Sequence, residues 1–174
     1  MPTLDRELVF LRNTVGSTYD PALMPSIFLA GPIERWTPDY GPRYTRWRDA
    51  AVGHLRRNYQ FHETDIRILN PEWDERPEGW SYEIQVEWEV EALRNATCIL
   101  CWIERIMPDL PGFTTNIEVG QWLTSPKLIV GAPPDTPHVK YIKTRRKMVD
   151  LSWFDSLVDC CEVALKYAVE CHKK

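Results

Sequence analysis

Short, nearly continuous apolar runs alternate along this chain with longer segments whose apolar residues recur at helical spacing. The apolar runs are Ile27–Ala30, Ile66–Leu69, Thr97–Ile103, Leu128–Gly131 and Val139–Ile142, and the helical segments are Arg43–Asn58, Ser81–Asn95, Thr115–Leu123 and Ser152–Cys171. Runs that are apolar at nearly every position are typical of parallel strands buried on both faces. Because strand and helix alternate, we predict a doubly wound α/β fold whose parallel sheet carries helices on both faces.

At 174 residues the chain has the length of one domain with a single sizeable core. We expect an N-terminal arm over residues 1–25, in which Leu8–Leu11 is a candidate short strand, and one domain over residues 26–174. The expected sheet of that domain is five-stranded and flavodoxin-like or Rossmann-like, so its ligand should bind at the carboxyl ends of the strands.

Charge and apolar content limit the class of partner. The formal net charge is -4, so no basic footprint indicates a nucleic-acid polymer as partner. No apolar run approaches the length that spans a bilayer, and residues 1–20 mix charges throughout without a signal-peptide core. We therefore expect a cytoplasmic protein that acts on a small molecule and has no membrane partner.

The cysteines and histidines do not form a ligand pattern. The chain has five cysteines without framework spacing and four histidines without metal-ligand spacing, so we expect reduced thiols, no metal and no cofactor. Cys98 and Cys101 lie three apart on an expected strand, so their side chains should point to opposite faces of the sheet.

Glu118 is the most informative single carboxylate. It lies near the start of an expected helix that follows the Thr97–Ile103 strand, at the edge of the sheet where ligands bind. Thr115-x-x-Glu118 has the spacing of a capping box, so one interpretation is structural. The other interpretation is a nucleophile, because a helix dipole holds a carboxylate anionic and an anion suits attack on a sugar anomeric carbon.

Four short segments carry a resemblance that favours the second interpretation. They are Ile27–Ile33, Asn70–Glu72, Gln85–Glu89 with Leu93 and Ala96, and Thr114–Gly120. In this order and spacing, from Ile27 to about Gly131, the chain resembles the nucleoside 2-deoxyribosyltransferase family and its nucleotide N-hydrolase relatives. The resemblance implies that Glu118 is the nucleophile. It also implies that Glu89, where the family usually has Asp, binds or protonates the leaving nucleobase.

A further departure from the family pattern lies close to the proposed nucleophile. Relatives carry an Asp six residues before the nucleophile, and this chain has Gly112 there.

Relatives are also homo-oligomers. The segment Ser152–Cys171 carries more apolar residues than one sheet face needs, so we expect a homodimer or higher homo-oligomer. The ending His172-Lys173-Lys174 differs from the family's apolar ending and does not suit insertion into a neighbour's pocket.

Further residues are candidates for substrate binding, each with a structural alternative. The candidates are Gly31, Pro32 and Ile33 after the first strand, Asn70, Gln85, Asn116 and the loop residue Trp36. Gly31 would let a ligand approach the backbone, or would simply form a turn. Asn116 would bind sugar hydroxyls, or would be a turn or capping residue. Trp36, with Trp73 and Trp80, would stack on a nucleobase or would pack against loops.

Gln85 lies four residues before Glu89 and therefore shares its helix face. The arginines Arg35, Arg43, Arg46 and Arg48 form either a solvated helix start or a clamp for a 5′-phosphate.

Together these observations predict an enzyme of N-glycosidic bonds. The first hypothesis is transfer of deoxyribose between nucleobases, from 2′-deoxynucleosides or their 5′-monophosphates, through a glycosyl-enzyme ester. One alternative is a deoxynucleotide N-glycoside hydrolase. The other is a nucleotide-binding or sensing module without turnover, which the glycine at position 112 motivates.

Overall fold

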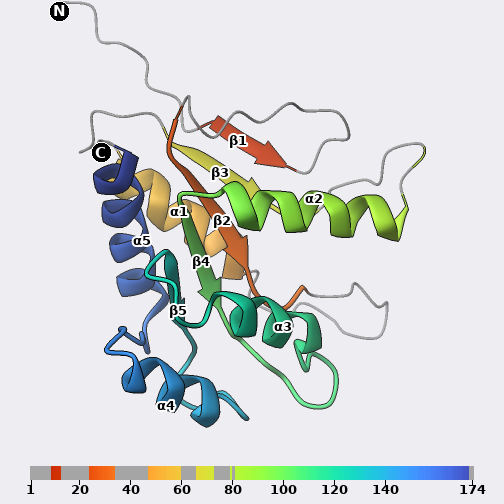
Figure 1. Ribbon diagram of the computed structural model, residues 1–174, viewed down its shortest axis with the longest axis vertical. Coiled ribbons are helices and arrows are strands. Elements are labelled where there is room, and N and C mark those ends of the chain that lie inside the picture. The colour runs from red at the N-terminus through yellow and green to blue at the C-terminus, as the bar shows by residue number, and fades with distance from the viewer. Residues whose placement is uncertain are drawn as a thin grey trace, which may run out of the picture.

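One parallel sheet forms the centre of the molecule. The structure is a computed structural model that describes residues 9–12, 24–33, 47–59, 66–72, 79 and 81–172. The sheet has the strand order β1-β3-β2-β4-β5 (Figure 1). Its strands are β1 (Val9–Arg12), β2 (Ser26–Ala30), β3 (Arg67–Asn70), β4 (Cys98–Trp102) and β5 (Leu128–Gly131). Every neighbouring pair is parallel, as the uniformly apolar runs predict.

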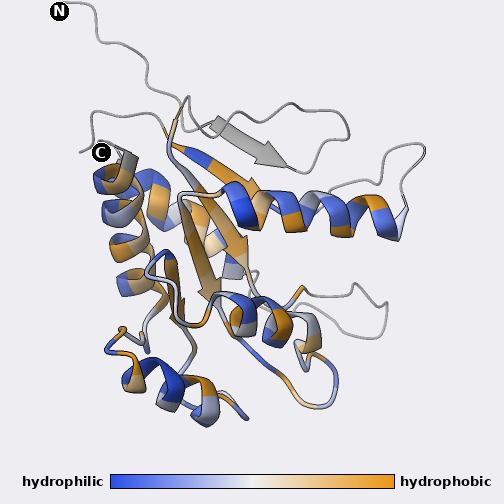
Figure 2. Ribbon diagram, in the orientation of Figure 1, coloured by the Kyte–Doolittle hydropathy of each residue, from blue (hydrophilic) through white to orange (hydrophobic). Residues whose placement is uncertain are grey.

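Helices cover both faces of this sheet. They are α1 (Trp47–Tyr59), α2 (Tyr82–Asn95), α3 (Phe113–Trp122), α4 (Lys140–Met148) and α5 (Leu157–His172). One core cluster joins α1 and α5 to the sheet, and a second joins α2, α3 and Ile142 of α4 to its other face. Figure 2 shows β2 and β4 hydrophobic between these helices. The α/β fold with a parallel sheet flanked by helices is confirmed.

Four of the five expected strands are present, and the fifth expectation is wrong. The segment Val139–Ile142, expected as a strand, is the start of α4: Val139 is the N-cap, and the helix begins at Lys140. Ile142 and Arg146 are its buried residues, and their spacing of four is helical. A window of four residues is too short to separate this period from that of a strand.

The remaining strand comes from the N-terminal arm. The candidate at residues 8–11 is found at Val9–Arg12, where β1 pairs with β3 at the edge of the sheet. This pairing adds an edge strand from a segment that the domain prediction had separated as an arm. Its partner is far away in the sequence, so local pattern gave no indication of the register.

The topology identifies one position on the sheet as a binding edge. Strand β2 lies between β3 and β4, because the crossover after β2 runs one way and the crossover after β3 returns past it. In doubly wound proteins such a reversal is where ligands bind, and here it lies at the carboxyl ends of β2 and β4. Residues 31–33 and the segment leading to α3 follow these two strands.

Local capping explains where two helices begin. Ser81, the first residue of the expected helical segment Ser81–Asn95, is the N-cap of α2, and its hydroxyl accepts a hydrogen bond from the Ile84 amide at 3.3 Å. The last expected helical segment, Ser152–Cys171, starts too early. Helix α5 begins at Leu157, and the Ser156 hydroxyl accepts from the Asp159 amide at 3.3 Å.

The cysteines behave as small buried hydrophobic residues. Cys98 belongs to the core on one face of the sheet and Cys101 to the core on the other, which confirms their opposite orientation. Both are free thiols, as are Cys160, Cys161 and Cys171. In the part of the chain that the structure describes, no helix is long and apolar enough to cross a bilayer.

Candidate active site

Helix α3 presents Glu118 differently from the capping interpretation. The helix begins at Phe113, and its N-cap is Gly112 in the left-handed conformation, with φ of 64°. Thr115 therefore lies inside the helix, and its buried hydroxyl has no hydrogen-bond partner among the described residues. The capping-box interpretation of Thr115 and Glu118 is wrong, because both residues lie beyond the first helical position.

Glu118 is half-buried, and its surroundings favour the protonated form. Its pKa is raised to about 7, first by burial and second by the negative charge of Glu89, while Arg48 acts in the opposite direction. The expectation that the helix dipole holds Glu118 anionic is therefore wrong. Glu118 is the sixth residue of α3, and the dipole acts mainly within the first turn. At neutral pH the two charge states of this carboxyl are nearly balanced.

Glu89 joins Glu118 from helix α2. Its pKa is raised by burial, which outweighs the lowering by a hydrogen bond from Gln85 and by the charge of Arg48. The amide nitrogen of the buried Gln85 donates to Glu89 Oε1 and, at 3.1 Å, to the Pro71 carbonyl. Gln85 thus orients Glu89, as their spacing on one helix face allows. The structure therefore brings together Glu118, Glu89 and Gln85 from two helices.

Arg48 of α1 is a cation that acts on both carboxyls, a relation that its position in the sequence did not indicate. Its side chain is 2% exposed, so neither the solvated interpretation nor that of a 5′-phosphate clamp holds for this arginine. The guanidinium donates to three backbone carbonyls at the end of β2 and, from Nη1, to Glu72 Oε1 at 2.9 Å. An ionic partner for Arg48 was already present in the Asn70–Glu72 motif, but no spacing in the sequence indicated their pairing.

The turn after β2 is shaped by packing against protein. Gly31 has φ of 145°, and a Cβ at this position would lie 2.4 Å from the Trp102 carbonyl oxygen. The glycine is therefore required by the close approach of β4. The buried Pro32 has a carbonyl that accepts from Trp47 Nε1 at 3.2 Å and from Arg48 Nη1 at 3.0 Å. Ile33 is 40% exposed and so remains available to a ligand.

The two asparagine candidates are already occupied by protein contacts. The buried Asn70 accepts a hydrogen bond from the Glu72 amide at 3.1 Å through its Oδ1 atom. Asn116 is exposed, and its Oδ1 accepts from Arg105, which also donates to the His138 carbonyl. Residues two apart on a helix do not share a face, so Asn116 and Glu118 project differently. Sugar binding by Asn116 is thus less favoured than a role in fixing α3.

Gly112 occupies the position where relatives carry an acid. Its left-handed backbone is strained for other residues, and a Cβ there would lie 2.9 Å from Pro32 Cγ. The turn after β2 therefore fills the space that a side chain at position 112 would need. The remaining tryptophan and arginine candidates, Trp36, Trp73, Trp80, Arg35, Arg43 and Arg46, lie outside the described residues.

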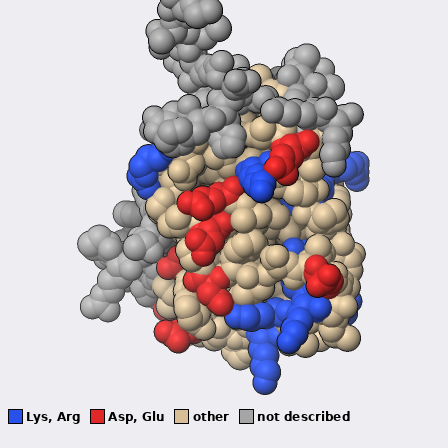
Figure 3. Space-filling view, turned by 90° about the vertical axis from the view of Figure 1, so that its left-hand side faces the viewer, with Lys and Arg blue, Asp and Glu red and all other residues tan. Residues whose placement is uncertain are grey.

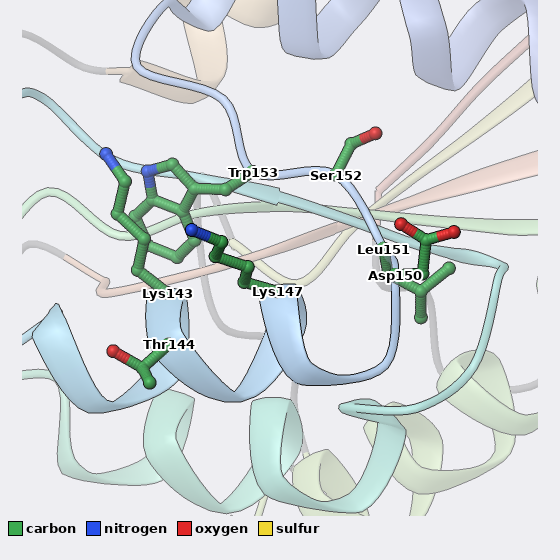
Figure 4. Close-up of a pocket in the computed structure, with 7 residues that line it drawn as sticks. All are labelled: Lys143, Thr144, Lys147, Asp150, Leu151, Ser152 and Trp153. Carbon is green, nitrogen blue, oxygen red and sulfur yellow. The ribbon is translucent and has the colours of Figure 1, made fainter.

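A hollow lies against α4, and its lining does not include the carboxyl pair. Its lining includes Lys143, Lys147, Asp150 and Trp153, and its volume is about 550 Å³. Figure 4 shows the two lysine side chains beside the Trp153 ring. Lys143 is paired with Asp155 at 2.9 Å. Figure 3 shows basic side chains gathered at the end of the face where α4 lies. Asp150 is the one carboxylate among the described residues that line this hollow, and neither Glu118 nor Glu89 takes part in it.

The chemistry of the first site is acid–base and nucleophilic. Two carboxyls with raised pKa lie at the topological switch point, with a buried cation beneath them. Such perturbed pairs are typical of sites that need one acid and one anion at the same pH. No metal-binding group of three His, Cys, Asp or Glu side chains is found among the described residues.

Residues 24–136 match the family model described as nucleoside 2-deoxyribosyltransferase like. The match covers more than half of the chain and includes β2, β3, α2, β4, α3 and β5. No curated protein matches the chain.

Proposed function

Because the chain belongs to the nucleoside 2-deoxyribosyltransferase-like family, we propose that it transfers deoxyribose between nucleobases, with Glu118 as nucleophile and Glu89 as acid. The single observation that carries this proposal is the half-buried carboxyl pair at the β2/β4 switch point. The substrates are 2′-deoxynucleosides or their 5′-monophosphates. Ile33 and Gln85 border the site on the sides of β2 and α2.

The charge state of the pair supports the proposed chemistry. Glu118 has a pKa of about 7 and Glu89 a raised pKa, so both carboxyls take up protons more readily than exposed carboxyls do. Retaining glycosyl transfer needs one carboxylate as nucleophile and one carboxylic acid for the leaving group. The form of the pair that this reaction requires has Glu118 ionised and Glu89 protonated.

The proposed reaction has two displacements. A Glu118 oxygen attacks C1′, the C1′–N bond breaks, and the base leaves with the bonding electrons and takes a proton from Glu89. The resulting ester is then attacked at C1′ by a nitrogen of a second base, which loses a proton to Glu89 as the Glu118 carboxylate is released. If water attacks instead, the product is free deoxyribose or its phosphate.

Chromatography of reaction mixtures tests this proposal. The full chain is incubated with a panel of deoxynucleosides and 5′-monophosphates, with and without an acceptor base. Glu118→Ala should abolish base release, whereas Gln121→Ala, an exposed change on the same helix, should leave it unaltered. A new nucleoside identifies transfer, and free sugar identifies hydrolysis. Near-wild-type turnover by Glu118→Ala would eliminate the mechanism.

A second candidate is a binding module without turnover, and Gly112 favours it. The turn at Pro32 leaves no room for a side chain where relatives carry an acid. Calorimetry with the same nucleotide panel separates this candidate from the first. Binding without any release of base over hours would favour the module.

Assembly into a homodimer also remains a proposal, but the surface proposed for it is now on α2 and α3 and no longer on the segment Ser152–Cys171. Most apolar residues of α5 are buried within the chain, while α3 exposes Phe113 and Ile117 at 73% and 72%. Helix α2 exposes Tyr82, Val86 and Val90 at a spacing of four, so a second copy is better placed against α2 and α3. Light scattering should report a dimer that Val86→Glu weakens; a wild-type monomer of 20.4 kDa would contradict this.

A further inference from the structure

Arg48 is a buried cation that holds one backbone turn at several points. Its Nε donates to the Leu29 carbonyl at 3.2 Å, Nη2 to the Gly31 carbonyl at 2.8 Å, and Nη1 to the Pro32 carbonyl at 3.0 Å. The preceding residue, Trp47, donates to the same Pro32 carbonyl. The first turn of α1 therefore fixes the carboxyl end of β2, which borders the site.

A charge at this depth requires compensation. Taking an ion out of water costs several kcal/mol unless a partner and hydrogen bonds offset the loss. Glu72 supplies the partner at 2.9 Å, and its own side chain is 29% exposed. Carbonyl oxygens alone could be satisfied by neutral donors. Arg48 differs from a clamp that binds carbonyls only, because it also has a carboxylate partner in Glu72, which follows β3.

The charged groups around Arg48 come from every neighbouring element. Glu72 follows β3, Glu89 lies on α2 and Glu118 on α3, while the Cys101 thiol lies on β4. Burial raises the pKa of Cys101 well above its usual range, so this thiol is neutral. Among the described residues, Arg48 is the cation that lowers the pKa of both Glu118 and Glu89, against burial.

We infer that Arg48 is a positioning residue with two effects: its hydrogen bonds fix the turn Leu29–Pro32, and its buried charge acts on the Glu118–Glu89 pair that this turn borders. The first effect concerns the fold. The second matters for catalysis only if Glu118 and Glu89 are the nucleophile and the acid, and in that respect it rests on the proposed function. Arg48 acts through these groups and is not itself assigned contact with substrate.

Arg146 provides a matched control for the hydrogen-bonding part of this role. It is 1% exposed and donates to the carbonyls of Leu123, Ser125, Leu128 and Ser152. Its charge is not among those that act on Glu118 or Glu89. Replacing either arginine removes a carbonyl clamp, but only the change at position 48 removes a charge from the carboxyl pair.

The test is a carbon-13 NMR titration of the Glu118 side-chain carboxyl in the full chain, without any ligand. The signal is assigned by its loss in Glu118→Gln. Arg48→Met should raise the midpoint by about one pH unit, because removing an opposite charge that acts on a carboxyl typically raises its pKa by one unit or more. Arg48→Lys should stay within about 0.3 of the wild-type midpoint, since it keeps the charge. Arg146→Met should leave the midpoint unaltered.

An unaltered midpoint in Arg48→Met, or an equal shift in Arg146→Met, would overturn the inference. If Arg48→Met does not fold, the double variant with Glu72→Gln is compared with Glu72→Gln alone, because it leaves no unpaired carboxylate. A midpoint that does not rise in that comparison would equally overturn the inference. The titration needs no turnover, so its outcome is distinct from base release. A shift without base release would retain the role of Arg48 and remove the proposed function.

Discussion

The carboxyl end of β2 and the amino end of β5 are each held by a buried arginine, and the two regions differ in what surrounds the cation. Arg48 binds three carbonyls and the carboxylate of Glu72. Its charge also lowers the pKa of Glu118 and of Glu89. Arg146 binds carbonyls only, and the titratable groups that act on it are the thiols of Cys101 and Cys160. A buried arginine that donates to backbone carbonyls thus stabilises the fold at both strands. At β2 its charge also acts on neighbouring carboxyls.

The largest expected effect on stability separates the two arginines directly. Arg48→Met should destabilise the protein by about 3–5 kcal/mol, because it leaves three buried backbone carbonyls without their donor and removes the ion partner of Glu72. Adding Glu72→Gln should recover part of this loss. Arg146→Met should cost about 1–3 kcal/mol, the penalty of leaving buried acceptors unsatisfied. Denaturant unfolding at pH 7 measures all of these variants. Equal losses, with no recovery by the second change, would remove the distinction between the two regions.

The next effect is a pH-dependent gain of stability at the β2 region. The pKa of Glu118 is about 7 in the folded protein against a usual 4.5, so its stabilising contribution is complete below pH 4.5 and is lost as pH rises through 7. Glu118→Gln should therefore raise the free energy of unfolding by about 3 kcal/mol at pH 8 and by little at pH 4.5.

The exposed change Glu87→Gln on α2 serves as the control for Glu118→Gln. It should leave the free energy of unfolding nearly unaltered at both pH values, since surface substitutions usually stay within about 0.5 kcal/mol. A gain in Glu118→Gln that is the same at pH 4.5 and pH 8 would show that the ionisation of Glu118 is not its cause.

A smaller effect sharpens the electrostatic side of the comparison. Glu89 raises the pKa of Glu118, so Glu89→Gln should lower the midpoint of the Glu118 titration by about half a unit to one unit. This direction is opposite to that expected for Arg48→Met. The carbon-13 titration measures both. An unaltered midpoint in Glu89→Gln would mean that the charge of Glu89 does not act on Glu118.

The smallest expected effect concerns the contact between Arg105 and Asn116. Asn116→Ala removes one acceptor of an arginine that also donates to the His138 carbonyl, so a loss of about 1 kcal/mol is expected. Base release should change by less than about threefold, because Asn116 and Glu118 do not share a helix face. A selective rise in KM with stability intact would restore Asn116 as a sugar ligand.

Much of the fold could be predicted from local pattern. Continuous apolar runs gave four strands, since such runs must be buried on both faces, and Ser81 marked the start of α2. The strand predicted at Val139–Ile142 was wrong, because four residues fit the period of a strand and that of a helix equally well. The helical period becomes visible only with Arg146, the next buried residue of α4. The pairing of β1 with β3 depends on a contact distant in the sequence, which no local pattern records.

The candidate site divides in the same way. Sequence by itself determined that Glu118 and Glu89 follow β4 and β3 and that Gln85 shares a helix face with Glu89, because order and spacing fix these relations. Only the tertiary structure decided how the groups are charged. Burial and the mutual repulsion of the two carboxyls raise the pKa of Glu118, and Arg48 opposes this rise from a third helix. Those influences depend on distances through space, which the order of residues does not contain.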